Sequence, residues 1–144
     1  MADKTILVVD DVQHYRDRIK HSLSSLGCKI DEADDGLAAW KLVESNNYDV
    51  IISDYRMPEK DGFWLLNQIN EHLKHRPPFY FCTSFAMYDS DAYRIGAQGY
   101  FAKDEIELLA KFVSLHVDRE QRYEKTQAKS SGVLPRFDER QANL

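Results

Sequence analysis

Five short apolar segments alternate along this chain with segments whose apolar residues recur every three or four positions. The apolar segments, read as strands, are Thr5–Val9, Cys28–Ala33, Val50–Ser53, Phe79–Cys82 and Gly99–Ala102. Strands that alternate with helices in this way are typical of βαβ units, whose strands form one parallel sheet. The alternation therefore predicts an α/β fold with five strands and five helices.

The helical segments begin or end at residues that commonly limit helices. The apolar face of the first helix comprises Val12, Tyr15, Ile19, Leu23 and Leu26. We expect Gly27 to end that helix, and further helices over 36–45, 63–73 and 90–95. A long last helix is expected to begin at Asp104, because Asp104 and Glu107 have the spacing of a capping box.

The composition of the strands predicts their order in the sheet. The first and third strands are almost wholly apolar, which indicates central strands that are buried on both faces. Cys28–Ala33 alternates apolar and polar residues, as an edge strand does. We therefore predict a flavodoxin-like, doubly wound sheet with the strand order 2-1-3-4-5. In that order Cys28 and Cys82 lie on strands that are not neighbours, so we expect no disulfide between them.

Length and charge limit the class of protein. The 144 residues fit one domain, which we place at residues 1–127, followed by a flexible C-terminal tail at 128–144. The net charge of −5 argues against nucleic-acid binding, which needs a basic surface. No apolar stretch reaches the ~20 residues of a membrane span, and the first residues do not form a signal peptide. We expect a cytoplasmic protein that does not bind membranes.

Charged and hydroxyl side chains follow four of the five predicted strands. They are Asp10 and Asp11, Asp54, Thr83 and Ser84, and Lys103. Ligands of an open parallel sheet bind outside the carboxyl ends of its strands, so these side chains are expected to converge. Carboxylates, hydroxyls and an ammonium group suit a hard cation together with a phosphoryl group.

The acidic residues have a chemical and a structural interpretation. Burying Asp10, Asp11 and Asp54 together is costly unless a cation lies between them, and Mg²⁺ suits such a site. The alternative is that Asp10 and Asp11 only cap the first helix. Asp54 is the candidate nucleophile, because carboxylates form acyl-phosphates. The turn from Arg56 to Gly62 could aim a backbone carbonyl at the metal.

These motifs together resemble the receiver domain of two-component response regulators, of the stand-alone chemotaxis type, over residues 4 to about 120. The matching segments are Ile6–Asp11, Asp54–Gly62, Thr83–Ser84, Gly96–Tyr100 and Lys103. The resemblance implies that a histidine kinase or a histidine phosphotransfer protein donates a phosphoryl group to Asp54. It implies a signalling module rather than an enzyme, apart from self-catalysed phosphotransfer.

The resemblance also implies a role for each site residue. Asp11, Asp54 and the carbonyl group of Arg56 would ligate Mg²⁺, and Asp10 would act mostly through bound water. Thr83 and Lys103 would contact the phosphoryl group. Tyr100 would be an aromatic switch that couples phosphorylation to a change between two conformational states.

Three residues depart from the family pattern or add bulk to the site. Asp104 stands where the family usually has a proline after the lysine. Arg56 and Phe85 are bulky side chains near the expected approach of a hydrolytic water, and they predict slow self-dephosphorylation. Two other interpretations remain: a degenerate receiver that acts as an unphosphorylated scaffold, and an aspartyl-phosphate phosphatase. The second would need an acid where Arg56 stands.

The last helix has apolar residues on two sides. Ile106, Leu109, Ala110, Val113 and Val117 form one stripe that can dock on the sheet. Leu108, Phe112 and Leu115 lie roughly opposite. This second set is either a surface for a homodimer or target protein, or a group of scattered exposed apolar residues.

Overall fold

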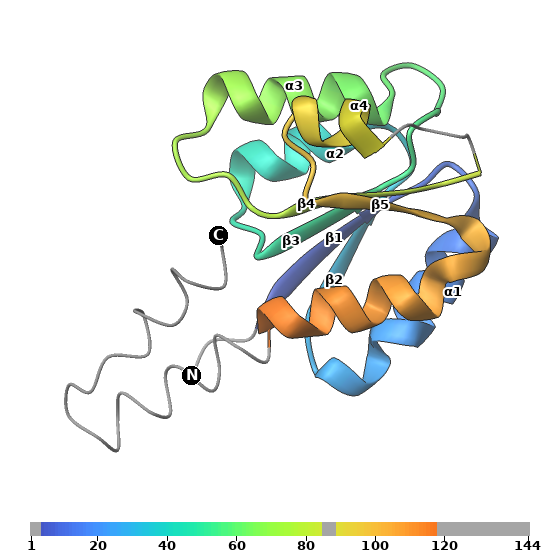
Figure 1. The fold of residues 1–144 in the computed structure, drawn as a ribbon. Helices are drawn as coiled ribbons and strands as arrows, with labels where there is room; N and C mark the ends of the chain where they lie inside the picture. Colours follow the sequence, from blue (N-terminus) through green and yellow to red (C-terminus); the bar gives the residue numbers. More distant parts are fainter. Residues whose placement is uncertain (1–3, 85–88, 118–144) are drawn as a thin grey trace, which may run out of the picture.

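The computed structural model of the protein describes residues 4–84 and 89–117, and its centre is a parallel sheet of five strands (Figure 1). The strands are β1 (Thr5–Val9), β2 (Lys29–Ala33), β3 (Val50–Ser53), β4 (Phe79–Thr83) and β5 (Gly99–Ala102). Their order is β2-β1-β3-β4-β5, which confirms the flavodoxin-like, doubly wound arrangement. The strand after Cys28 begins one residue later than predicted.

Helices cover both faces of this sheet. They are α1 (Gln13–Leu23), α2 (Gly36–Ser45), α3 (Gly62–His72), α4 (Asp89–Arg94) and a last helix whose described part is residues 106–117. Short 3₁₀ turns at Ser24–Leu26 and Lys103–Glu105 follow α1 and precede the last helix. Figure 1 shows α1 and the last helix on one face of the sheet and α2, α3 and α4 on the other.

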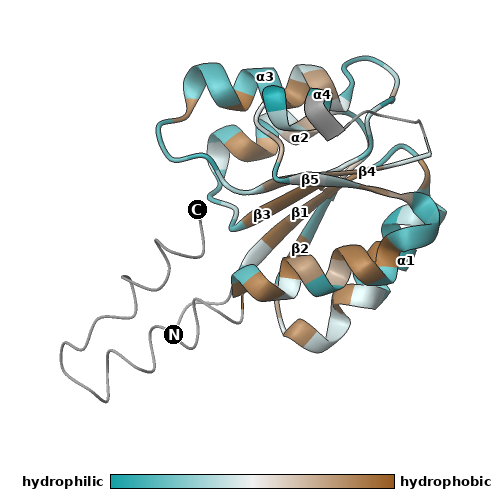
Figure 2. Ribbon diagram, in the orientation of Figure 1, coloured by the Kyte–Doolittle hydropathy of each residue, from teal (hydrophilic) through white to brown (hydrophobic). Residues whose placement is uncertain are grey.

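The core consists of two apolar clusters, one on each face of the sheet. Alternate residues of β1 enter different clusters: Ile6 and Val8 pack under α1 and the last helix, and Leu7 and Val9 pack under α2 and α3. All four side chains are at most 1% exposed. The hydropathy colouring in Figure 2 shows the same apolar centre, with β1 and β3 brown between the helical layers. The prediction that these strands are central is confirmed.

Apolar residues at the start of three helices are exposed, and one of them, Val12, was predicted to lie on a buried helix face. Val12 is the N-cap of α1 and is 42% exposed, and Leu37 and Phe63 are 38% and 36% exposed. Each lies in or just before the first turn of a helix, near the strand ends, where the sheet no longer covers it. Helical periodicity identifies a face but does not show where that face leaves the core.

The start of the last helix differs from the prediction. The side chain of Glu105, not Glu107, accepts a hydrogen bond from the backbone N–H of Ala102 at 2.9 Å. The predicted capping pair of Asp104 and Glu107 is therefore wrong, because the chain first makes a 3₁₀ turn at Lys103–Glu105. Gly27 ends the first helical segment as predicted, with a φ of 69° that glycine adopts without strain.

The two sides of the last helix differ as expected. Ile106, Leu109, Val113 and Val117 are at most 2% exposed, whereas Leu108, Phe112 and Leu115 are 43%, 43% and 49% exposed. Within residues 4–84 and 89–117, no helix is long and apolar enough to cross a membrane. The predicted boundary between residues 127 and 128, and the tail at 128–144, lie outside the described residues.

Candidate functional site: an acidic pocket at the strand ends

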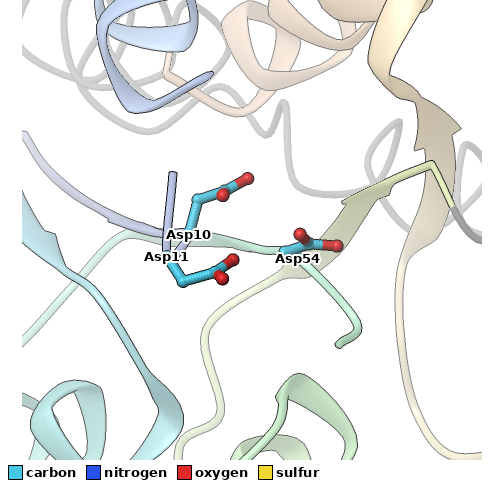
Figure 3. A group of neighbouring side chains, drawn as sticks. All are labelled: Asp10, Asp11 and Asp54. Atoms are coloured by element: carbon cyan, nitrogen blue, oxygen red, sulfur yellow. The ribbon is translucent and has the colours of Figure 1, made fainter. Parts of the chain in front are cut away.

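Three carboxylates meet at the carboxyl ends of β1 and β3 (Figure 3). Asp10, Asp11 and Asp54 each offer one oxygen atom, and these atoms all lie within 4.8 Å of one another. Asp10 is fully buried, Asp54 is partly buried and Asp11 is exposed. The sequence-based prediction that these side chains converge is confirmed by this geometry.

The sheet itself fixes the positions of two of these residues. The N–H of Asp54 donates to the carbonyl oxygen of Val9 at 2.8 Å, and the N–H of Asp10 donates to that of Ala33 at 3.1 Å. Both aspartates therefore extend the parallel hydrogen-bond pattern one residue beyond their strands. One carboxylate oxygen of Asp10 also accepts from the N–H of Val12 at 2.9 Å, which holds the side chain inward.

Lys103 brings a positive charge into the pocket from the end of β5. Its ammonium group pairs with the carboxylate of Asp10 and lies 3.6 Å from Oδ2 of Asp54. The lysine side chain is only 7% exposed, so the pair with Asp10 is shielded from water. The peptide bond between Lys103 and Asp104 is trans. Lys103 thus reaches the site although Asp104, and not the proline of the receiver-domain pattern, follows it.

Thr83 is the other predicted residue in contact with Asp54. Its side chain is 3% exposed and hydrogen-bonds to the Asp54 carboxylate, whereas Ser84 is exposed. The N–H of Tyr55 donates to Oδ1 of Asp54 at 2.7 Å. Phe85 lies outside the described residues.

The environment of Asp54 makes its ionisation less favourable than in water, so its pKa is raised. Burial raises the pKa of Asp54 above its ordinary value, and the negative charge of Asp10 adds to this effect. The ammonium group of Lys103 and the hydrogen bonds from Thr83 and Tyr55 oppose it. Asp54 is therefore a carboxylate whose charge is incompletely compensated by the protein alone.

The loop after Asp54 forms the open side of the pocket. Arg56 is exposed and lines, together with Asp11 and Asp61, a hollow of about 640 Å³. The loop closes at Gly62, whose N–H donates to the carbonyl oxygen of Tyr55 at 2.9 Å. A Cβ atom at Gly62 would lie 2.1 Å from the carbonyl oxygen of Asp54, so a larger residue cannot fit without moving the loop.

Tyr100 lies on the edge strand β5, three residues before Lys103. It is a half-buried residue of β5 that packs against the cluster beneath α2, α3 and α4. Tyr100 also borders a groove beside the last helix. Its role as a switch stays a prediction.

Two residues of α1 belong to the site and were not identified from the sequence. A guanidinium nitrogen of Arg16 donates to the carbonyl oxygen of Asp10, and Nε of Arg16 pairs with Glu32 at 3.0 Å. The ring of Tyr15 lies 4.4 Å from the ammonium nitrogen of Lys103. The helical periodicity predicted only that Tyr15 lies on the apolar face of its helix. No pattern in the sequence indicates that Arg16 donates to a backbone carbonyl.

The donor set suits a small hard cation. Mg²⁺ prefers carboxylate oxygens, takes few of them and keeps several waters. One buried, one partly buried and one exposed carboxylate around a common space fit that preference, because the exposed side leaves room for water. The pocket can therefore hold Mg²⁺ next to Asp54.

The chain resembles known proteins along most of its length. Residues 6–114 match the family model of the response regulator receiver domain. The chemotaxis protein CheY of Pseudomonas aeruginosa is 38% identical over 103 residues, which are 68% of this chain and 82% of that protein. Chemotaxis protein CheY-3 of Vibrio cholerae is 36% identical over 103 residues, which cover 68% and 78% of the two chains.

Solved structures agree with this match. The response regulator TrrA from Thermotoga maritima, solved in complex with Mg²⁺ and a beryllium fluoride, is 34% identical, with a TM-score of 0.67 over 78% of this chain and 98% of that one. The receiver domain of the Francisella response regulator 1452 is 27% identical, with a TM-score of 0.74 over 82% and 99%. The chain belongs to the receiver domain family of two-component response regulators and is a CheY-like phosphoacceptor signalling module.

Proposed function

We propose that Asp54 is the residue that accepts the phosphoryl group, from a phosphohistidine on a histidine kinase or histidine phosphotransfer protein. The observation that supports this assignment is the set of contacts of Asp54. Among the three carboxylates, Asp54 combines partial exposure with a hydrogen bond to Thr83 and a nearby ammonium group at 3.6 Å. Asp10 is fully buried and already paired, and Asp11 is exposed at the edge.

The transfer exchanges one bond of phosphorus for another. A carboxylate oxygen of Asp54 forms a bond to phosphorus while the phosphorus–nitrogen bond of the phosphohistidine breaks. The electron pair of that bond stays on the imidazole nitrogen, which regains its ordinary neutral form after proton exchange with water. Lys103 and Thr83 would donate to the phosphoryl oxygens, where negative charge accumulates, and their contacts with Asp54 support this role.

Receiver domains typically bind Mg²⁺ at an acidic pocket, and we propose the same for this chain. Asp11, Asp54 and the carbonyl group of Arg56 would hold the ion directly. Asp10, with one oxygen bonded to the Val12 amide and the other paired with Lys103, would act through bound water. The ion supplies positive charge that offsets the carboxylates and the phosphoryl oxygens.

Two further proposals concern the phosphorylated state. Slow self-dephosphorylation is supported by the bulky Arg56 side chain, which lies two residues after Asp54 and lines a hollow together with Asp11 and Tyr55, where it can obstruct water. We propose that phosphorylation shifts the protein between two states through Thr83, Lys103 and Tyr100. The absence of any enzymatic activity beyond these steps, and the cytoplasmic location, stay predictions.

A partner surface is proposed on the last helix. Leu108 and Phe112 line a groove of about 470 Å³ together with Tyr93 of α4 and Phe101 of β5, and the ring centroids of Phe101 and Phe112 are 5.3 Å apart. Exposed apolar side chains around a groove favour a protein target or a second copy of the chain. Phe112→Glu is expected to reduce that association, and Leu37→Glu, a similarly exposed apolar position on α2, is the matched control.

The phosphoacceptor role is tested with acetyl phosphate and Mg²⁺. Intact-protein mass spectrometry is expected to show one added phosphoryl group on the wild type and on Asp17→Asn, a surface control on α1. Asp54→Asn should show none. A wild type that stays unmodified with acetyl phosphate and with phosphorylated histidine proteins would support the scaffold interpretation, and release of phosphate without an adduct would support a phosphatase.

A further inference from the structure

The ring of Tyr15 covers the ammonium group that faces the phosphoacceptor. The ammonium nitrogen of Lys103 lies 4.4 Å from the ring centroid of Tyr15. Tyr15 is half-buried in the first turn of α1 and packs against the cluster beneath α1 and the last helix. The contact therefore joins the start of α1 to the end of β5. In the sheet, β1, which leads into α1, and β5 lie on opposite sides of β3, the strand that ends at Asp54.

This contact restrains a side chain that is otherwise flexible. A lysine has four rotatable bonds and a compact charge, so its ammonium group needs partners to stay in one place. Glu105 fixes the backbone at Ala102, next to Lys103, but does not reach along the side chain. Among the described residues, the ammonium itself lies against the carboxylates of Asp10 and Asp54 and against the ring of Tyr15.

The position of the ammonium group matters for phosphoryl binding. Lys103 is 7% exposed, and attraction between a cation and an aromatic ring is strongest where water is excluded. Oδ2 of Asp54 lies 3.6 Å from the same nitrogen, so a small displacement brings the ammonium to a group bound on Asp54. A lysine held there in advance loses less conformational freedom when it meets the phosphoryl oxygens.

We propose that Tyr15 is a positioning residue for phosphoryl binding, which acts by holding Lys103 between Asp10 and Asp54. The face of the ring supplies the restraint, and the phenol hydroxyl is not required. This inference rests on the proposed role of Asp54 as phosphoacceptor, and its first test does not depend on phosphorylation.

The contact itself is tested by NMR of the lysine side chains. A ring centred 4.4 Å from the nitrogen shields the neighbouring methylene protons, so the Lys103 ε-protons are expected upfield of the other lysines in the wild type and in Tyr15→Phe. Lys103→Arg identifies the resonance by its loss. Tyr15→Leu should return the resonance to the ordinary lysine position. An ordinary position in the wild type would overturn the contact.

The consequence is tested by binding of beryllofluoride, a phosphoryl mimic, in the presence of Mg²⁺. We expect Tyr15→Leu to raise its dissociation constant by about fivefold, and Tyr15→Phe to leave it near the wild-type value. The matched control is Trp64→Leu, which removes another half-buried ring next to a different lysine, Lys60 at 5.4 Å. This control should also bind as the wild type does.

The outcomes separate the positioning role from other effects. A folded Tyr15→Leu with wild-type affinity, or an equal loss in Tyr15→Phe, would overturn the proposal. If Tyr15→Leu does not fold, Tyr15→Trp takes its place, since it keeps a ring face and should retain the upfield resonance and the affinity. A wild type that shows the upfield resonance but binds no beryllofluoride would contradict the role of Asp54 and not the contact.

Discussion

Replacing Lys103 with methionine removes the positive charge from the pocket while keeping most of the side-chain volume. The fully buried carboxylate of Asp10 then loses its ion pair and keeps the hydrogen bond from the Val12 amide at 2.9 Å. Breaking a buried pair by removing one partner costs about 3–5 kcal/mol. Asp11 is exposed, so water reaches one side of the pocket. We therefore expect Lys103→Met to lower the free energy of unfolding by about 3 kcal/mol, the lower end of this range.

A double-mutant cycle separates the lost pair from lost packing. Asp10→Asn combined with Lys103→Met leaves no unpaired charge at these two positions, so we expect the double variant to recover at least half of the loss. Urea unfolding followed by the fluorescence of the buried Trp40 measures each free energy. Mg²⁺ should also stabilise Lys103→Met more than the wild type. A cost below about 1 kcal/mol, or simple additivity of the two changes, would refute the buried pair.

Three other changes test separate parts of the structure. Burial raises the pKa of Asp54 above 3.8, so ionisation of Asp54 lowers the stability of the fold as the pH rises. Asp54→Asn should therefore raise the melting temperature at pH 7, and the gain should shrink toward pH 4. A gain that does not change with pH would contradict this reasoning. Gly62→Ala should lower the free energy of unfolding in urea by about 2 kcal/mol and slow phosphorylation, because its Cβ meets the Asp54 carbonyl. Gly27→Ala is strained only in its backbone, so it should lower the free energy of unfolding by about 1 kcal/mol and leave phosphorylation unchanged. A thiol reagent should modify Cys28 in the native protein and Cys82 only after unfolding, since burial raises the pKa of the Cys82 thiol to about 11; rapid native modification of Cys82 would contradict this environment.

Much of the fold could be predicted because its signals are local. The apolar runs at Ile6 and Ile51 are buried on both faces, and such runs distinguish central strands from the mixed edge strand that follows Cys28. Strand order then follows from few possible topologies. The errors are at element ends: Val12 lies beyond the covered part of its helix, and the 3₁₀ turn makes Glu105 the capping residue.

The site could be predicted only where topology alone brings residues together. Asp10 and Asp54 directly follow neighbouring parallel strands, so the sheet places them side by side. The partner of Lys103 depends on side-chain packing across the pocket, and no spacing in the sequence indicates that it pairs with Asp10 and lies against Tyr15. Helical periodicity assigns Tyr15 to the core, which is correct for part of the ring but omits its contact with the charge.

In the proposed mechanism Asp54, and not one of the neighbouring acids, carries the phosphoryl group. Borohydride reduction after incubation with a phosphorylated histidine kinase and Mg²⁺ converts an acyl-phosphate to an alcohol, and peptide mass spectrometry then locates the converted residue. We predict conversion at Asp54 alone, lost when the donor is omitted. Conversion at Asp10, Asp11 or Asp61, with Asp54 unchanged, would contradict the account.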